Sequence, residues 1–296
     1  MEKSASHDRC PVRPLSEEER EERARLTNGE PVADFGANPF VSYLADDILL
    51  SLQNPRTKEF SEPAFLIMSQ VVELLFKLAH TEARQARDLL DLDDVAGALW
   101  VFRRLSRVQN VLTDTWEVLS SLSPVEYGAF RDQLGEGSGL QSSMYRHLEF
   151  ILGNKNEAMV TPHRGDPAVH RELRRALGEP SLYDAALRLL RRRGFPVPQD
   201  CAERDWALPY EERQEVADAW QLVYQDPDRH LELHQLAEAL VDIAYDFGRW
   251  RAAHLLTVER LLGSKAGTGG TSGVRWLRRV AEHRFFPELW LVRSGI

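Results

Sequence analysis

From about residue 38 onward, the chain consists of long amphipathic segments separated by short polar breaks. Within the segments, apolar residues recur every three or four positions, which is the period of one face of an α-helix. The segments with this pattern are 40–53, 63–90, 92–121, 124–134, 139–152, 168–177, 181–193, 209–224, 230–262 and 273–283. Runs that alternate between apolar and polar residues, as in half-buried strands, are nearly absent. The pattern therefore predicts an all-α protein, a helical bundle.

The breaks between these segments predict how the chain is organised. Residues 1–37 carry charged runs and little to bury, so we expect a polar N-terminal tail. Residues 38–296 are expected to form one helical domain. Within it, residues 156–208 are rich in Pro, Arg and Asp and fall between the two halves of the bundle, which indicates a small helical insertion. No repeat of fixed period is found, so a solenoid is not favoured.

Composition narrows the class of protein. The 296 residues are 43% hydrophobic and 28% charged, which is typical of a soluble globular protein, and the net charge of -9 argues against nucleic acid as a partner. Two cysteines, Cys10 and Cys201, fit neither a disulfide framework nor a CxxC metal site. No uninterrupted apolar run of membrane-spanning length and no signal-like N-terminus is found. We therefore expect a cytoplasmic protein that does not bind membranes.

One histidine stands out because of the residues around it. In segment 230–262 the apolar positions recur at spacings of three and four, and His254 lies within this stripe. A buried imidazole needs a partner, because an unsatisfied buried polar group costs about 1–3 kcal/mol. Two interpretations remain at this point: a core histidine bonded to a carbonyl or carboxylate, or a ligand of a metal or heme.

The glycine-rich run 263–273 follows directly on this segment. It superficially suggests a phosphate-binding loop, but such a loop follows a strand and ends in Gly-Lys-Ser/Thr at a helix start. Here the run follows a predicted helix, and Lys265 lies near its beginning. It is either a flexible connection or a loop whose amides and Thr268 hydroxyl close over a polar ligand group.

Taken together, these residues resemble a known family. Residues 250–273 closely resemble the heme-ligand helix and substrate loop of tryptophan 2,3-dioxygenases. Further segments with the same resemblance are 130–134, 138–142, 149–155 and 284–290. The resemblance runs from Asn38 to the C-terminus and is weakest between Asn156 and Gln225. It implies an all-helical fold with bound heme b, a homotetramer, and tryptophan or a substituted tryptophan with O2 as substrates.

The same resemblance implies roles for individual residues. His254 corresponds to the axial ligand of the heme iron, and a neutral imidazole on a rigid helix suits that task. Arg131 corresponds to the arginine that binds the substrate carboxylate, for which a planar guanidinium is well shaped. Tyr127 corresponds to a substrate-pocket tyrosine, and Phe65 to an aromatic residue that packs on the indole. Thr268 corresponds to a loop threonine that holds the amino-acid end of the substrate.

Three of these roles have plain alternatives, as do two residues near the N-terminus. Arg131 could be a solvent-facing helix charge, Tyr127 a packing residue and Phe65 an ordinary core residue. Phe40 and Tyr43 resemble the N-terminal helix that the family contributes to the pocket of a neighbouring subunit, but a plain dimer contact would also explain an exposed aromatic pair.

The sequence departs from the family on the distal side of the expected heme. Ser69 occupies the place of a histidine that acts there as a catalytic group, Phe60 and Ser61 replace a His-Asp pair, and Leu75 replaces a pocket-flanking tryptophan. A serine cannot act as an imidazole base, but its hydroxyl can bond to bound oxygen or to the indole N–H. Related indoleamine 2,3-dioxygenases have a serine at the comparable place, so dioxygenation remains possible.

Three functions are therefore left open. In the first, both oxygen atoms of O2 enter the indole and cleave its C2–C3 bond, giving an N-formylkynurenine. In the second, one atom enters and the ring stays closed as a 2-oxindole, as in an oxygenase of maremycin biosynthesis that acts on β-methyltryptophan. The third is a non-catalytic heme sensor, which the amino-acid clamp of Arg131, Tyr127 and Thr268 argues against.

Overall fold

The structure is a computed structural model, and the regular secondary structure of its described residues is helical. The residues that it describes are 15–27, 38–265, 267 and 270–295. Across these residues no strand occurs, so the all-α prediction is confirmed. The chain divides into two compact units, residues 1–54 and residues 55–296, and each is described by itself.

The described residues of the first unit, 15–27 and 38–54, form three short helices. They are α1 (Glu17–Thr27), α2 (Pro39–Leu44) and α3 (Asp46–Leu49). The Asn38 side chain accepts a hydrogen bond from the Val41 backbone N–H at 3.2 Å and so caps α2. Ala45 adopts a left-handed conformation (φ 50°, ψ 42°) that ends α2. The single helix expected over 40–53 is therefore wrong in its extent.

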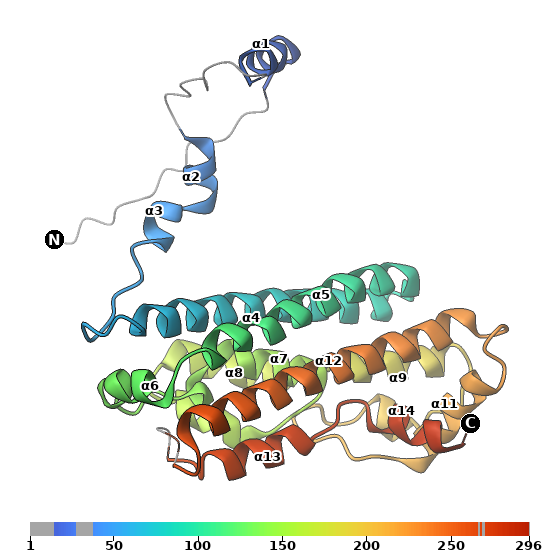
Figure 1. The fold of residues 1–296 in the computed structure, drawn as a ribbon. Helices are drawn as coiled ribbons and strands as arrows, with labels where there is room; N and C mark the ends of the chain where they lie inside the picture. The colour runs from blue at the N-terminus through green and yellow to red at the C-terminus, as the bar shows by residue number, and fades with distance from the viewer. Residues whose placement is uncertain (1–14, 28–37, 266, 268–269, 296) are drawn as a thin grey trace. The chain divides into compact units, whose positions relative to one another are not determined.

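The second unit is built around three long helices (Figure 1), α4 (Glu62–Asp91), α5 (Val95–Ser120) and α12 (Leu231–Leu262). The shorter α-helices are α6 (Pro124–Arg131), α7 (Ser143–Leu152), α8 (Pro167–Leu177), α9 (Leu182–Arg192), α10 (Gln199–Ala202), α11 (Gln214–Gln225), α13 (Val274–Glu282) and α14 (Pro287–Val292). The 3₁₀ segments are η1 (Asp132–Leu134), η2 (Gly139–Gln141), η3 (Glu157–His163) and η4 (Arg293–Gly295).

Helix α5 packs against both α4 and α12 and forms the middle of the core. On α4, the small residues Ala79, Ala83 and Ala86 are fully buried at spacings of four and three, which lets neighbouring helices approach closely. Leucines on the facing helices, such as Leu105 and Leu240, are also fully buried. This packing holds α4, α5 and α12 rigidly together, and α4 and α12 contain several of the predicted site residues.

Polar contacts fix where α4 begins and tie it to α6. The buried Glu62 carboxylate accepts hydrogen bonds from the backbone N–H groups of Arg56 and Thr57, each at 2.7 Å. The Arg56 guanidinium in turn donates to the backbone carbonyl of Gln133 at 2.9 Å. Helix α6 starts with a capping box in which Ser123 and Glu126 bond to each other's backbone N–H. The ends of α4 and α6 are thereby held together.

Residues 156–208, the segment predicted as an insertion, contain η3, α8, α9 and α10. Helix α8 and η3 pack on each other and on α7, and side chains from them form a small apolar cluster with Phe150. The buried Lys155 ammonium donates to the carbonyls of Ala176 and Glu179 at 2.9 and 2.7 Å, which caps the end of α8. Helix α9, by contrast, packs on α4 and belongs to the main core.

Two helices near the C-terminus, α14 and α11, differ from the predicted segments, and a buried carboxylate joins them. Helix α14 was not predicted, because six residues are too few to show a period. The segment expected to be helical from 209 becomes so only at Gln214. Glu288 of α14 accepts hydrogen bonds from the Tyr183 and Tyr210 hydroxyls and from the Arg213 backbone N–H, at 2.8, 2.6 and 2.9 Å. The hydrogen bond from the Arg213 backbone N–H holds Arg213 in an extended conformation just before α11.

Candidate active site

An aromatic cluster forms where α4 meets α6. The Phe65 ring of α4 lies 5.6 Å from the Tyr127 ring and 5.6 Å from the Phe130 ring, measured between centroids. Tyr127 and Phe130 contact each other edge-on at 5.4 Å. Phe130 is fully buried, whereas Phe65 and Tyr127 are half-buried. The structure thus brings two predicted site residues, Phe65 and Tyr127, together in a surface suited to a flat apolar ring.

Arg131 lies one turn after Tyr127 on α6, so the two side chains share a helix face. Burial raises the pKa of the Tyr127 hydroxyl, while the charge of Arg131 and a hydrogen bond to it act in the opposite direction. The guanidinium is half-buried at the end of α6. It is a fixed positive charge next to the aromatic surface, an arrangement able to bind a carboxylate attached to an aromatic ring.

Ser69 lies one turn after Phe65 on α4 and is half-buried. Its hydroxyl donates a hydrogen bond of 2.7 Å to the Phe65 backbone carbonyl. A serine hydroxyl has one proton, so in this arrangement Ser69 presents only acceptor lone pairs to its surroundings. Of the other distal substitutions, Phe60 is 99% exposed and lies just before α4, whereas Leu75 packs against the core.

His254 lies on α12 in contact with two tryptophan rings, which also contact each other. The imidazole stacks on Trp116 of α5, with ring centroids 4.5 Å apart and ring planes within 8°. Trp250, one turn earlier on α12, contacts His254 at 5.5 Å. Burial lowers the pKa of His254 to about 4, and no charged neighbour contributes to that shift. The imidazole is therefore neutral at pH 7 and has a lone pair available for a metal.

A buried ion-pair network supports α12 next to His254. The Arg251 guanidinium donates to the Glu149 carboxylate at 2.7 Å, and Arg146 pairs with the other oxygen of the same carboxylate. All three side chains are almost fully buried. Burial alone would raise the pKa of Glu149, but the two arginines outweigh it and hold the pKa below its usual range. The carboxylate stays ionised and fixes α12 to α7.

The surroundings of His254 fit a metal whose other ligands come from a bound macrocycle rather than from the protein. Over the described residues, no group of three or more His, Cys, Asp or Glu is arranged to hold a metal ion. A metal bound here would thus have one protein ligand, as in a macrocycle with an axial histidine. The indole N–H groups of Trp116 and Trp250 are buried and make no hydrogen bond. Such orphan donors are rare in folded proteins and indicate that a group outside the polypeptide completes this site.

The glycine-rich loop between α12 and α13 has glycine-specific conformations at both ends. Gly263 and Gly273 have φ of 58° and 60° with ψ near -120°, a region that other residues avoid. Within the loop, the Gly267 N–H donates to the Thr271 carbonyl at 3.2 Å. Thr268, the predicted loop ligand, lies outside the described residues. Its role stays a prediction.

Phe40 and Tyr43 lie on α2, in the first unit. Their side chains are 66% and 79% exposed. Exposed aromatic rings on one short helix suit a contact with another surface. Their place in a substrate pocket stays a prediction.

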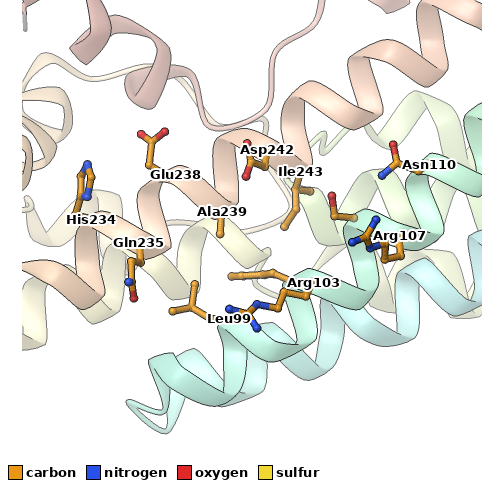
Figure 2. A pocket seen from close by; sticks show the side chains of 12 residues that line it. Leu99, Arg103, Arg107, Asn110, His234, Gln235, Glu238, Ala239, Asp242 and Ile243 are labelled. Carbon is orange, nitrogen blue, oxygen red and sulfur yellow. The ribbon is translucent and has the colours of Figure 1, made fainter.

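A separate groove of about 730 Å³ lies between α5 and α12. Figure 2 shows Arg103 and Arg107 on its α5 wall and Glu238 and Asp242 on its α12 wall. No residue predicted from the sequence to belong to the site lines it. The groove is therefore distinct from the candidate active site.

Sequence reasoning missed Trp116 as a site residue. Trp116 and His254 are 138 positions apart in sequence, and they meet only because α5 and α12 pack along each other. In the sequence, Trp116 is one more apolar position on an amphipathic helix. No local signal distinguishes it, and only the tertiary structure reveals the contact.

Comparison with known proteins agrees with this geometry. The family model described as tryptophan 2,3-dioxygenase matches residues 27–222 and 221–296. The tryptophan 2,3-dioxygenase of Bradyrhizobium sp. (strain BTAi1) is 47% identical over 270 residues, which cover 91% of this chain and 97% of that protein. Tryptophan 2,3-dioxygenase 1 of Ralstonia nicotianae is 45% identical over 254 residues, 86% of each chain. The chain belongs to the tryptophan 2,3-dioxygenase family.

Proposed function

We propose that the protein is a heme-dependent dioxygenase that cleaves the indole C2–C3 bond of L-tryptophan and forms N-formylkynurenine. The observation that carries this proposal is a neutral, half-buried imidazole, His254, in the same helical bundle as an aromatic surface flanked by a guanidinium. The names of the relatives support the same reaction, because they are tryptophan 2,3-dioxygenases that cover most of this chain.

In this proposal, Arg131 and Tyr127 select the substrate by its carboxylate. The guanidinium donates charge-assisted hydrogen bonds to it, and the Tyr127 hydroxyl, which stays protonated at neutral pH, contacts the same end of the substrate. Phe65 would pack against the indole and exclude water from the reacting carbons, and the buried Phe130 ring supports Phe65 from the core side. Together these residues would hold the indole in one orientation, which lowers the entropic part of the barrier.

His254 would hold the cofactor by its imidazole nitrogen, and we propose heme b as the form of heme. When bound, heme supplies ferrous iron, which binds and activates O2. The Trp116 and Trp250 rings keep water away from the imidazole, and the Arg251–Glu149 pair fixes the helix that carries it. The chain's own contribution on this side is to hold one neutral ligand in one place.

Ser69 would act on the distal side only through weak contacts. Its hydroxyl proton is bonded to the Phe65 carbonyl, so proton transfer to or from Ser69 is not part of the proposed mechanism. The smaller side chain leaves more space than a histidine would. A substituted tryptophan, such as a β-methyl derivative, is therefore a second candidate substrate.

We also propose that the enzyme is a homo-oligomer, with a tetramer as the state that the family resemblance implies. Helix α4 is long and apolar enough to span a membrane by length and composition alone, and little of its apolar window is buried within the chain. Ile67, Leu74 and Leu78 form an exposed apolar row on it. A second copy of the chain would cover such a face, as oligomer interfaces do. A free, buried thiol at Cys201 is compatible with the cytoplasm, where we place the enzyme.

The test is aerobic incubation of the heme-reconstituted, reduced protein with L-tryptophan and with β-methyltryptophan, followed by mass spectrometry. We expect a product that is heavier than tryptophan by two oxygen atoms and absorbs as a ring-opened kynurenine. A gain of one oxygen atom would identify a 2-oxindole and contradict ring cleavage. If no product forms and the ferrous heme spectrum does not change when either indole is added, the protein is a heme sensor instead.

A further inference from the structure

The stack of Trp116 on His254 is geometrically distinct from the other ring contacts around it. Its centroid distance of 4.5 Å and angle of 8° describe two nearly parallel rings in van der Waals contact. The neighbouring pairs are longer and tilted: Trp116 to Trp250 at 5.7 Å and 49°, and Trp250 to His254 at 5.5 Å and 46°. A parallel contact on one side leaves the imidazole little freedom to rotate about its χ2 angle.

Other means of holding the imidazole are missing among the described residues. A histidine that binds a metal usually donates its second ring N–H to a carboxylate or carbonyl, which fixes the ring and makes the ligand more basic. No hydrogen bond or ion pair joins the His254 ring to any described residue. Glu149, on the neighbouring α7, is fully engaged by Arg146 and Arg251.

We propose that Trp116 is a positioning residue that fixes the plane of the His254 imidazole by stacking, in place of the usual carboxylate partner. This inference rests on the proposed function, because it takes His254 as the iron ligand. It has an electronic consequence. Without a carboxylate to accept its N–H, the ligand keeps the character of neutral imidazole, donates less charge to iron, and favours the ferrous state that reacts with O2.

The test compares three variants of the full-length, heme-loaded protein. Trp116→Phe keeps an aromatic ring in the stack, whereas Trp116→Met has an unbranched side chain and no aromatic face. Trp100→Leu is the matched control, because Trp100 lies on the same helix α5 and is 62% exposed. For each protein, three quantities are measured: the iron–histidine stretching band of the ferrous form, the rate of heme transfer to apomyoglobin, and the heme reduction potential.

We expect Trp116→Met to broaden the iron–histidine band. Heme loss should become about threefold to tenfold faster, which corresponds to the loss of one aromatic pair. The reduction potential should fall, because water then reaches the imidazole N–H. Trp116→Phe should keep a narrow band, and its rate of heme loss should stay within about twofold of the wild-type rate, because the aromatic pair is retained. Trp100→Leu should match wild type in all three measurements.

Wild-type values for band, transfer rate and potential in a folded Trp116→Met protein would overturn the inference and leave Trp116 as a space-filling residue. If Trp116→Met does not fold by circular dichroism, Trp116→Leu takes its place with the same expected result. The proposed function fails separately, if the wild-type protein shows no histidine-ligated heme spectrum at all.

Discussion

Ser69→Ala tests whether the distal hydroxyl takes part in the proposed mechanism. The Ser69 hydroxyl donates its one proton to the Phe65 carbonyl at 2.7 Å, on the preceding turn of α4. To act on substrate or oxygen as a donor, it would first have to break that bond. A neutral hydrogen bond contributes about 0.5–1.5 kcal/mol, and about 1.4 kcal/mol corresponds to a tenfold change in rate. We therefore expect kcat/KM for tryptophan to fall by no more than about tenfold.

The assay is the initial rate of N-formylkynurenine formation in air-saturated buffer, with enzyme concentrations matched by heme content. Thr81→Ala is the matched control, because the Thr81 hydroxyl makes the same bond to the Lys77 carbonyl on the same helix, at 2.9 Å, in an exposed position. Both variants lose one such bond within α4, so an effect of helix stability alone would appear in both. Only a chemical role of the distal hydroxyl would separate them.

A loss of more than about a hundredfold in Ser69→Ala corresponds to roughly 2.7 kcal/mol, more than one neutral hydrogen bond contributes. With heme content and tryptophan affinity intact, that result would contradict a merely weak contact of the Ser69 hydroxyl. It would show that the hydroxyl leaves Phe65 during the reaction and bonds to oxygen or to the indole N–H. A change in the ratio of one-oxygen to two-oxygen products would point the same way.

Three further predictions concern His254, Arg131 and the buried carboxylate of Glu149. His254→Ala should abolish the histidine-ligated heme spectrum; an unchanged spectrum with normal activity would exclude it as the ligand. Arg131→Ala should weaken tryptophan binding by about 2–5 kcal/mol and erase the preference for tryptophan over tryptamine, measured as a ratio of kcat/KM; a preserved ratio would remove Arg131 from the carboxylate site. Glu149→Gln should lower the free energy of unfolding by about 3–5 kcal/mol, because it leaves Arg146 and Arg251 buried without a counter-charge. Since the folded-state pKa of Glu149 is lowered, its stabilisation is present above the ordinary glutamate pKa and is lost as the pH falls through the folded value. Urea unfolding should therefore show a constant difference between wild type and variant from pH 6 to 8 that shrinks below about pH 4; a difference that grows on acidification would contradict the assignment.

The helices could be predicted from the sequence wherever they are long and one-sided. The periodicity that defined segments 63–90 and 230–262 gives α4 and α12 to within two residues at each end. Prediction failed where the decisive contact is tertiary. Helix α14 is too short for a period, and the start of α11 is set by the bond from Arg213 to Glu288 across the chain.

The candidate site could likewise be predicted only where the signal is local in the sequence. Phe65, Tyr127 and Arg131 could be found because family-like strings surround them, and the structure brings Phe65 to Tyr127 and Tyr127 to Arg131. The bond that occupies Ser69 and the stack of Trp116 on His254 could not be found, since the first depends on a rotamer and the second on how α5 lies against α12.

The most direct test of the central claim is a single turnover of the reduced, heme-loaded protein with L-tryptophan under oxygen-18 gas. If the protein is a dioxygenase, both labelled atoms of one O2 molecule appear in N-formylkynurenine, one on each carbon of the cleaved C2–C3 bond. A product that carries a single labelled atom on an intact indole-derived ring would contradict dioxygenation.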